Sequence, residues 1–408
     1  MTPPDVVADA GPMVSTAHRP TEPADVGPVA LVTYSSKPRG GVVHTLAVAE
    51  ALASIGTSVE VIALSDPGVG FYRPVGVPCR LFDAPDPAAT LDERVFNAVD
   101  ALAAGLEGLG DSLPRIIHTQ DCIAARAACR VRDRRRGAPL TVVRTVHHVE
   151  DFSTSALIDC QRRAIVEPDR VLVVSRTWQR ILHDDYGVEA EIVPNGVDVD
   201  RFATPPAPSV IARLRAQVGV GDRRLCLTVG GFEPRKGSDH LVRALATVRR
   251  TLGSAPLLVV VGGHSFQDHR AYRQTVLDSL PGLGLALGRD VVLLGMMPDE
   301  EMQAWYHAAD AFAFPSVSEG WGLVVLEAMA AGLPVVATDI PVFREYLTSG
   351  VDALLVPPGD DRALAAALTT VLSDDEARRR LASRGRAVAA RYSWEASARR
   401  HVEVYGSL

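Results

Sequence analysis

Two glutamates and two glycines in one short stretch have the types and spacing of a nucleotide-sugar site. Glu319 and Glu327 stand eight positions apart, and Gly322 and Leu323 open an apolar run that predicts a short helix ending near Ala331. Free amide groups at the start of a helix bind phosphate, and glycine lets a ligand approach the backbone closely. Carboxylates beside such a phosphate site could accept hydrogen bonds from sugar and ribose hydroxyls. The alternative is a pair of carboxylates that only stabilise a helix N-terminus.

The two lysines of the chain mark two further loops. Of 42 basic residues, only Lys37 and Lys236 are lysines, and each stands beside a glycine-containing loop. Gly40 and Gly41 follow the first expected strand, and Arg235 adjoins Lys236 in GGFEPRKG. A cation and flexible backbone after a strand suit a diphosphate. Neither loop has the GxGxxG fingerprint of dinucleotide enzymes, which argues against a dinucleotide oxidoreductase.

Histidines follow two other expected strands. His118 and Asp121 follow one in HTQD, and His147 and His148 follow another in TVHHVED. Functional groups concentrate at the carboxyl ends of the strands in parallel sheets. The histidines are therefore either site residues or ordinary residues of surface loops.

Alternating strands and helices must position all these loops. A strand at 29–34 precedes a glycine loop and a helix at 42–55, and the pattern recurs with a strand at 225–229 and a helix at 238–252. The proline-containing segment 194–209 predicts a turn and a linker between the two series. The alternation predicts an α/β protein with two doubly wound parallel sheets. Further strands are expected at 59–64, 115–118, 140–146, 171–174, 191–193, 257–261, 291–294, 311–314 and 335–337.

Composition narrows the class of protein. The 408 residues are 47% hydrophobic and 22% charged, which predicts a globular protein of two domains. The net charge of −7 argues against a nucleic-acid partner. Residues 1–27 lack the pattern of a secretory signal and are expected to be a disordered tail. The five cysteines include no CxxC pair, which favours the cytoplasm and no structural metal. The arginine-rich segment 130–136 predicts a solvated helix face, with a patch for an anionic acceptor or membrane as the alternative.

Five segments together resemble the retaining family-4 glycosyltransferases of the GT-B fold, the glycosyl transferases of group 1. The resemblance covers about residues 28–408 and implies two facing Rossmann-like domains. Residues 28–196 would form the acceptor-side domain and 197–385 the donor-binding domain, and a C-terminal helix at 386–408 would cross back to the first. The segments are RGGVVHTLAVAEALASIG (39–56), TVHHVED (145–151), PNGVDVDRF (194–202), EPRKG (233–237) and EGWGLVVLEAMAAGLPVVAT (319–338).

The resemblance implies roles for the residues that match. His147 would lie near the sugar and the phosphate, Lys236 would neutralise the diphosphate, and Glu319 would contact the transferred sugar. Glu327 would bind the ribose hydroxyls. The residues expected to bind the donor are Gly40, Gly41, Arg235, Lys236, Gly322, Leu323 and Glu327.

Two positions depart from the family pattern. Gly231 stands where the family usually has an arginine, so that Arg235 is the only cation beside Lys236 in this loop. Gln120 stands where the HxHD-like segment usually has its second histidine. The first departure bears on diphosphate binding, and the second on contacts with the acceptor.

The sequence thus predicts an enzyme that moves a hexose from a UDP- or GDP-sugar to an acceptor hydroxyl with retention. No DxD stands in a suitable loop, so we expect no cofactor and no essential metal. The acceptor (a sugar, a small molecule or a lipid-linked group) is left open, with at most peripheral membrane contact. The alternatives are a nucleotide-sugar epimerase of the same fold and a catalytically inactive nucleotide-sugar-binding protein.

Overall fold

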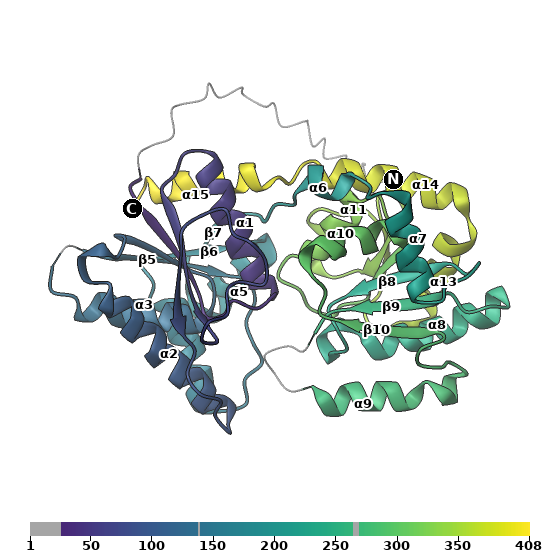
Figure 1. Cartoon of the computed structure of the whole chain (residues 1–408), viewed down its shortest axis with the longest axis horizontal. Helices are drawn as coiled ribbons and strands as arrows, with labels where there is room; N and C mark the ends of the chain where they lie inside the picture. The colour runs from purple at the N-terminus through teal and green to yellow at the C-terminus, as the bar shows by residue number, and fades with distance from the viewer. Residues whose placement is uncertain (1–25, 138, 264–268) are drawn as a thin grey trace, which may run out of the picture.

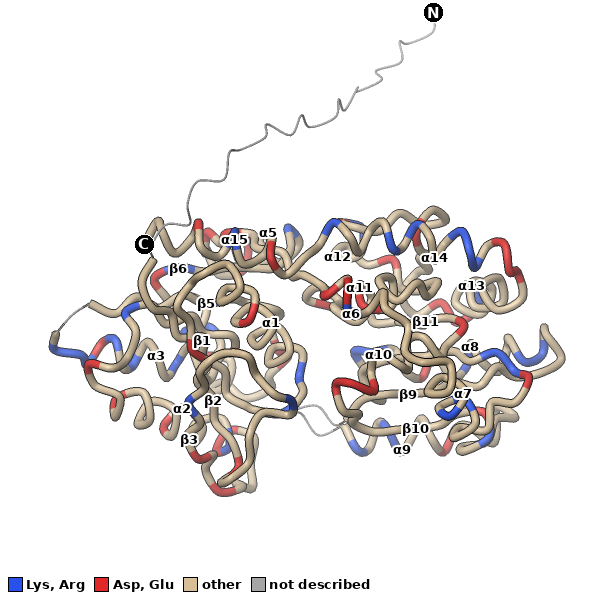
Figure 2. The backbone as a smooth tube through the Cα atoms, turned by 45° about the horizontal axis from the view of Figure 1, so that its top comes forward, with Lys and Arg blue, Asp and Glu red and all other residues tan. Residues whose placement is uncertain are grey.

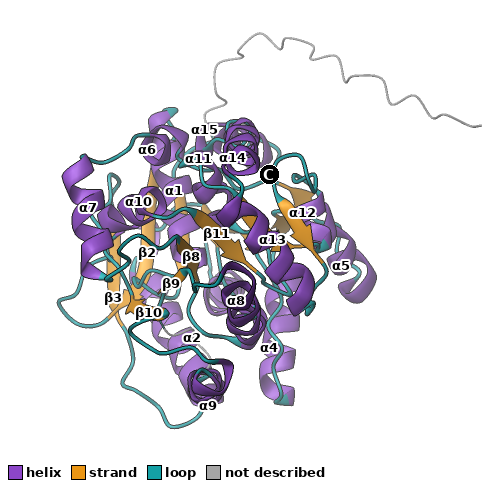
Figure 3. Ribbon diagram, turned by 90° about the vertical axis from the view of Figure 1, so that its right-hand side faces the viewer, coloured by secondary structure: helices purple, strands orange, loops and turns teal. Residues whose placement is uncertain are grey.

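The computed structural model describes residues 26–137, 139–263 and 269–408. Most of the expected N-terminal tail, residues 1–27, therefore lies outside the described residues. The chain forms two lobes, each built on one parallel sheet (Figure 1). The strand orders are β3-β2-β1-β4-β5-β6-β7 and β10-β9-β8-β11-β12-β13. Figure 3 shows the strands lying between layers of helices, as the α/β prediction requires.

The first lobe is organised around strands that are buried on both faces. Every residue of β1, VALVT, is buried, as expected for a central parallel strand covered by helices on both sides. The elements are β1 (Val29–Thr33), α1 (Gly40–Ser54), β2 (Val59–Ser65), β3 (Cys79–Asp83), α2 (Leu91–Gly108), a 3₁₀ turn (Gly110–Ser112), β4 (Ile116–Thr119), α3 (Cys122–Arg134), β5 (Thr141–Val146), α4 (Ser155–Val166), β6 (Arg170–Val173), α5 (Arg176–Tyr186) and β7 (Glu191–Ile192).

The second lobe repeats this plan around β9, LLVVV, which is also buried throughout. Its elements are α6 (Val199–Ala203), α7 (Pro208–Gln217), β8 (Leu225–Val229), a 3₁₀ turn (Pro234–Lys236), α8 (Ser238–Leu252), β9 (Leu257–Val261), α9 (Arg270–Ser279), a 3₁₀ turn (Pro281–Leu283), β10 (Val291–Gly295), α10 (Asp299–Ala308), β11 (Ala311–Phe314), α11 (Leu323–Ala330), β12 (Val335–Thr338), α12 (Pro341–Arg344), β13 (Leu354–Val356), α13 (Asp361–Ser373) and α14 (Asp375–Ala389). The last helix of the chain, α15 (Trp394–Tyr405), follows this lobe.

Three local features differ from the sequence prediction. The strands β3 and β13 were not expected, because β3 is an exposed edge strand without an apolar run and β13 has only three residues. The expected linker at 204–209 ends early, since Pro208 begins α7. Proline suits the first helical position, where its missing N–H would have no partner within the helix.

The chain crosses between the lobes twice, and the two crossings are bonded to each other. The amide of Val197 donates to the carbonyl of Tyr392 over 3.0 Å. After the second crossing, α15 lies beside α1 of the first lobe (Figure 1). Ala398 and Val402 pack there in one buried apolar cluster with Leu46 of α1. The C-terminal helix therefore adds to the core of the first lobe.

A further set of hydrogen bonds joins α5 of the first lobe to the second. The amides of Arg176 and Thr177 both donate to the Glu345 carboxylate over 2.8 Å. These are first-turn amides, which have no partner within their own helix. The carboxylate of Glu345 therefore caps α5 from the other lobe.

Most of the arginine-rich segment forms the end of α3, and the three of its arginines that lie within that helix are paired with carboxylates. Arg134 pairs with Glu107 over 3.2 Å and Arg132 pairs with Asp169 over 3.0 Å. Arg130 pairs with Asp100. Basic and acidic residues are interspersed along the backbone of both lobes (Figure 2). Among the described helices, none combines the length and apolar character needed to cross a membrane.

Candidate active site

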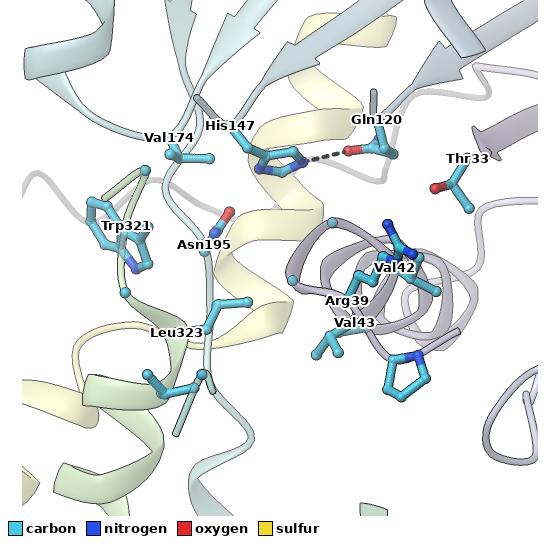
Figure 4. Close-up of a pocket in the computed structure, with 18 of the residues that line it drawn as sticks. Thr33, Arg39, Val42, Val43, Gln120, His147, Val174, Asn195, Trp321 and Leu323 are labelled. Atoms are coloured by element: carbon cyan, nitrogen blue, oxygen red, sulfur yellow. Dashed lines mark hydrogen bonds between the residues drawn. The ribbon is translucent and has the colours of Figure 1, made fainter. Parts of the chain in front are cut away.

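A cavity of about 1240 Å³ lies between the two lobes, where the carboxyl ends of both sheets meet. Figure 4 shows His147 and Gln120 on one side of this space and Trp321 and Leu323 on another. Every site residue predicted from the sequence borders the cavity. These residues are Gly40, Gly41, His147, Arg235, Lys236, Glu319, Gly322, Leu323 and Glu327.

Glu319 is the centre of a cluster of donors on the second lobe. Its Oε1 accepts hydrogen bonds from Lys236 Nζ over 2.7 Å and from Arg235 Nη1 over 2.9 Å. Ser316 Oγ donates to the same oxygen over 2.6 Å. The ammonium of Lys236 also lies 4.7 Å from the centre of the Phe314 ring, where a cation is attracted to the π-face. The positions of both cations are therefore fixed before any ligand binds.

Attraction to the two cations keeps the Glu319 carboxylate ionised at the cavity. Burial alone would raise the pKa of Glu319, but Lys236 and Arg235 lower it to about 2, so the carboxylate is ionised. Burial lowers the pKa of Lys236, and the neighbouring Glu319 opposes that shift. Lys236 and Arg235 border the cavity and are attracted by a second carboxylate, Glu233, as well as by Glu319. Such a site can stabilise an anion that forms during a reaction.

The main chain explains why residue 231 is a glycine. Gly231 has φ +70°, and a Cβ atom there would lie 2.6 Å from the carbonyl oxygen of Gly263. Any side chain would therefore force the two loops apart. Arg235 supplies the second cation of the cluster from another position of the same loop.

Glu327 and Leu323 lie one helical turn apart on α11, and both face the cavity. Tyr306 Oη donates to Glu327 Oε2 over 2.7 Å. Burial raises the pKa of Glu327 to about 7, although the hydrogen bond from Tyr306 opposes this. The Glu327 carboxyl therefore changes charge near neutral pH. Nothing in the sequence around Tyr306 indicated this contact.

His147 approaches the cavity from the end of β5. Its Nε2 is hydrogen-bonded to Gln120 Oε1 over 3.1 Å, as Figure 4 shows. The ring of His44, from α1, lies edge-on to it with ring centres 4.5 Å apart. Burial, and then the neighbouring His44, lower the pKa of His147 well below its ordinary value. His147 is therefore neutral at physiological pH and can act as a hydrogen-bonding group.

Two other residues singled out in the sequence are structural. His118 is completely buried and is hydrogen-bonded to Tyr405 and Thr145, each over 2.7 Å. It does not border the cavity, and placing it in a surface loop is also wrong. Asp121 borders the cavity, but it caps α3 by accepting a hydrogen bond from the amide of Ala124 over 2.8 Å. Both side chains hold strand ends in position.

The structure also brings in residues that the sequence analysis did not mark as part of the site. Asn195 was read only as part of a turn, but its buried side chain borders the cavity at the first crossing. Trp321 borders it from the second lobe (Figure 4). Asn195 Oδ1 and Trp321 Nε1 are buried without a hydrogen-bond partner among the described residues. Over the same residues, no three His, Cys, Asp or Glu side chains are grouped as metal ligands.

The two halves of the chain match two family descriptions. Residues 210–388 match "Glycosyl transferases group 1" and residues 38–201 match "Glycosyltransferase Family 4". The chain is 30% identical to a D-inositol 3-phosphate glycosyltransferase of Xylanimonas cellulosilytica, over 89% of this chain and 90% of that protein. It is 35% identical to a GDP-mannose-dependent alpha-(1-6)-phosphatidylinositol monomannoside mannosyltransferase of Mycolicibacterium smegmatis, over 59% of this chain and 63% of that one.

A solved structure resembles the whole two-lobed arrangement. Anabaena HepE in complex with UDP-glucose superposes with a TM-score of 0.75 at 21% identity, over 93% of this chain and 100% of that one. This likeness confirms the GT-B fold that the sequence predicts.

Proposed function

The chain belongs to the glycosyl transferases of group 1, and we propose that it moves a hexose from a nucleoside-diphosphate sugar to an acceptor hydroxyl with retention. The observation that carries this proposal is the cluster of Lys236 and Arg235 on Glu319, which faces His147 across the cavity between the lobes. Preorganised cations beside a neutral histidine suit the departure of a diphosphate.

The donor would bind mainly to the second lobe. Lys236 and Arg235 would hold the diphosphate, together with the first amides of α11. Glu327 would accept hydrogen bonds from the ribose hydroxyls. Glu319 would accept hydrogen bonds from hydroxyls of the transferred sugar. The start of α1, at Gly40, would face the diphosphate from the first lobe. The name of the Mycolicibacterium relative and the UDP-glucose bound to HepE support a GDP- or UDP-sugar as donor.

The transfer would proceed on one face of the sugar. The bond between the anomeric carbon and the phosphate oxygen breaks, and its electron pair goes to the nucleoside diphosphate. The acceptor oxygen bonds to the same face of that carbon, and its proton passes to the departing phosphate oxygen. Lys236 and Arg235 stabilise the charge that builds on the phosphate, so no metal is essential in this scheme. His147 hydrogen-bonds the sugar as it moves.

The acceptor would bind to the first lobe, and approach of the lobes would exclude water from the cavity. The names of the two relatives refer to different compounds, D-inositol 3-phosphate and a phosphatidylinositol monomannoside. These names therefore leave the acceptor of this chain open. The five free cysteines support a location in the reducing cytoplasm.

Calorimetric titration with UDP, GDP, ADP and NAD, in EDTA, tests the donor site on the wild type and on Glu327→Ala. Micromolar binding of one nucleoside diphosphate, weakened in the variant, would support the proposal and name the base. The matching nucleotide sugar is then incubated with acceptors, and NMR of the products assigns the anomeric configuration. Release of an epimerised sugar without an acceptor, or binding of NAD alone, would overturn the proposal.

A further inference from the structure

Arg144 is a buried cation at the wall of the cavity that the proposed mechanism does not use. It lies on β5, and only 5% of its surface is exposed. Strand alternation places it on the same sheet face as Val142, towards α3, whereas Thr145 and His147 lie on the face towards α1. The residues that border the cavity include Arg144.

The guanidinium of Arg144 forms no hydrogen bond or ion pair with the residues that the structure describes. Its Nε and Nη1 are buried and lack a hydrogen-bond partner among the described residues. Two other half-buried arginines of the chain are paired, Arg126 with Glu167 and Arg215 with Asp310. Arg144 forms no such ion pair with a described residue. A guanidinium stays protonated, so burial cannot be relieved by loss of the charge.

The carboxylate that most attracts Arg144, that of Asp121, already accepts three hydrogen bonds from other residues. Its Oδ2 accepts from Thr33 Oγ1 over 3.0 Å and from the amide of Tyr34 over 2.8 Å. Its Oδ1 accepts from the amide of Ala124 over 2.8 Å. Asp121 therefore holds β1 and α3 in place and leaves the guanidinium without a bonded anion. Arg144 borders the cavity, so an anion bound there could pair with its guanidinium.

The surroundings of Arg144 favour one negative charge over two. Ile123 and Phe152 border the cavity and belong to the same apolar cluster as Val142. Asp121, whose carboxylate attracts Arg144, also borders the cavity. Beside this pair, a single carboxylate brings less uncompensated negative charge than a phosphate dianion, and such charge is costly to bury.

We propose that the acceptor carries a carboxylate in addition to the hydroxyl that is glycosylated, and that this carboxylate binds the Arg144 guanidinium. The acceptor is thus a hydroxy acid such as a sugar acid. This inference rests on the proposed function, which assigns the acceptor to the first lobe. Arg144 acts as a specificity-determining residue, while the reacting groups are those of the second lobe and His147.

The test compares three sugars that differ at one carbon: D-glucose, D-glucuronate and D-glucose 6-phosphate. Each is titrated into the full chain saturated with the nucleoside diphosphate that it binds. We expect glucuronate to bind at least tenfold more tightly than glucose and more tightly than the phosphate ester. In Arg144→Gln this preference for glucuronate should fall at least tenfold, with nucleotide binding unchanged. Arg144→Lys, which keeps the charge, should retain part of it.

Arg170→Gln is the matched control, because Arg170 lies on the neighbouring strand β6 and does not border the cavity. It removes the same charge and should leave the preference for glucuronate intact. Equal binding of glucose and glucuronate in the wild type, or an unchanged preference in Arg144→Gln, would overturn the inference. Tighter binding of the phosphate ester would overturn the carboxylate assignment. If Arg144→Gln unfolds, the preference for glucuronate over glucose measured in the wild type and in Arg144→Lys decides between these outcomes.

The two proposals fail in different ways. A wild type that binds none of the nucleoside diphosphates contradicts the proposed function. A wild type that binds one of them but shows no preference for the acidic sugar contradicts only the role of Arg144.

Discussion

The main chain of Gly320 lies against the carbonyl group of His147, so closely that a Cβ atom on Gly320 would overlap the carbonyl oxygen. These two residues belong to different lobes. His147 is itself proposed to contact the sugar, and Gly320 adjoins Glu319, the other residue proposed to do so. Trp178 Nε1 of α5 also donates to the carbonyl oxygen of Glu319 over 3.0 Å. The first lobe therefore holds the Glu319 loop from two sides. Catalytic geometry here depends on contact between the lobes as well as on the cluster itself.

Gly320→Ala should lower turnover more than tenfold, because the added methyl group must push the His147 and Glu319 loops apart. A displacement of about 1 Å can cost on the order of a hundredfold in rate. Nucleoside diphosphate binding should change much less, since Glu327 and the start of α11 are not moved. Steady-state kinetics with titration of the nucleotide separates the two effects. Gly282→Ala is the control, because nothing lies within 4 Å of a Cβ at that position; wild-type turnover in Gly320→Ala would contradict the argument.

Lys236→Ala should lower kcat on the order of 10²–10³-fold, the scale of a lost transition-state donor. The variant leaves Glu319 with Arg235 and Ser316, so the loop should stay folded. Arg134 is more than half exposed, pairs with Glu107 over 3.2 Å and does not border the cavity. Because an exposed pair contributes little, Arg134→Ala is the control for loss of a surface cation. Equal rates for the two variants would remove Lys236 from the leaving-group site.

Much of the site was predictable because its residues are marked by local patterns. Lys236, Glu319 and Glu327 stand in glycine loops or at the start of a helix, directly after apolar runs that read as buried strands. In a parallel sheet those positions converge on one edge whatever the details of packing. The same logic placed His147 at the cavity, and it explains why two lobes could be expected from one repeated pattern.

The features of the site that the sequence did not predict depend on contacts between segments far apart in the chain. His118 has the same local pattern as His147, but Tyr405, far along the chain, returns to bury it. Tyr306 and Trp178 donate hydrogen bonds to Glu327 and to the Glu319 carbonyl, respectively. Both lie in helices whose sequences carry no motif that would mark them as part of a site. Nothing in the sequence around Arg144 shows that its partner is missing, since that follows from what Asp121 already binds.

Replacing Gly231 by the arginine usual in the family should weaken the protein instead of strengthening donor binding. Residue 231 has a positive φ, and its Cβ would meet the Gly263 carbonyl, so the loops must separate. We expect a lower melting temperature and weaker nucleotide binding for Gly231→Arg. Gly231→Ala should share the loss of stability, on the order of 1–3 kcal/mol. Tighter nucleotide binding by Gly231→Arg would show that the loop can accommodate a side chain.

Arg235→Gln tests whether Arg235 acts as the second cation of the cluster during the reaction. Its guanidinium is one of the two positive charges on Glu319, and the backbone at 231 offers no place for another. We expect turnover to fall at least tenfold, with a smaller change in nucleotide binding. The double variant with Lys236→Ala should lose less than the product of the two single losses, because both cations act on one carboxylate and one phosphate. Fully multiplicative losses would contradict a shared role.

Glu327→Gln should change how stability depends on pH. The folded protein holds the Glu327 carboxyl at a pKa of about 7, above the ordinary value of 4.5. Between these two pH values the folded state binds a proton that the unfolded chain has lost, so stability falls as pH rises through this range and the penalty is complete above pH 7. Glutamine does not titrate and can still accept the Tyr306 hydrogen bond. The variant should therefore equal the wild type near pH 5 and exceed it at pH 8 by about 1–2 kcal/mol, because the carboxyl borders the cavity and is partly hydrated.

Urea unfolding at pH 5, 6 and 8 measures this difference, and Glu300→Gln, on the exposed side of α10, is the control. Nucleotide binding should respond in the opposite direction. A ribose hydroxyl donates best to the ionised carboxylate, so wild-type affinity should fall as pH drops below 7, whereas Glu327→Gln should bind weakly at every pH. If the variant gains no stability at pH 8, burial does not destabilise the ionised Glu327 carboxylate. If the variant binds nucleotide as tightly as the wild type, the ribose does not use this carboxylate.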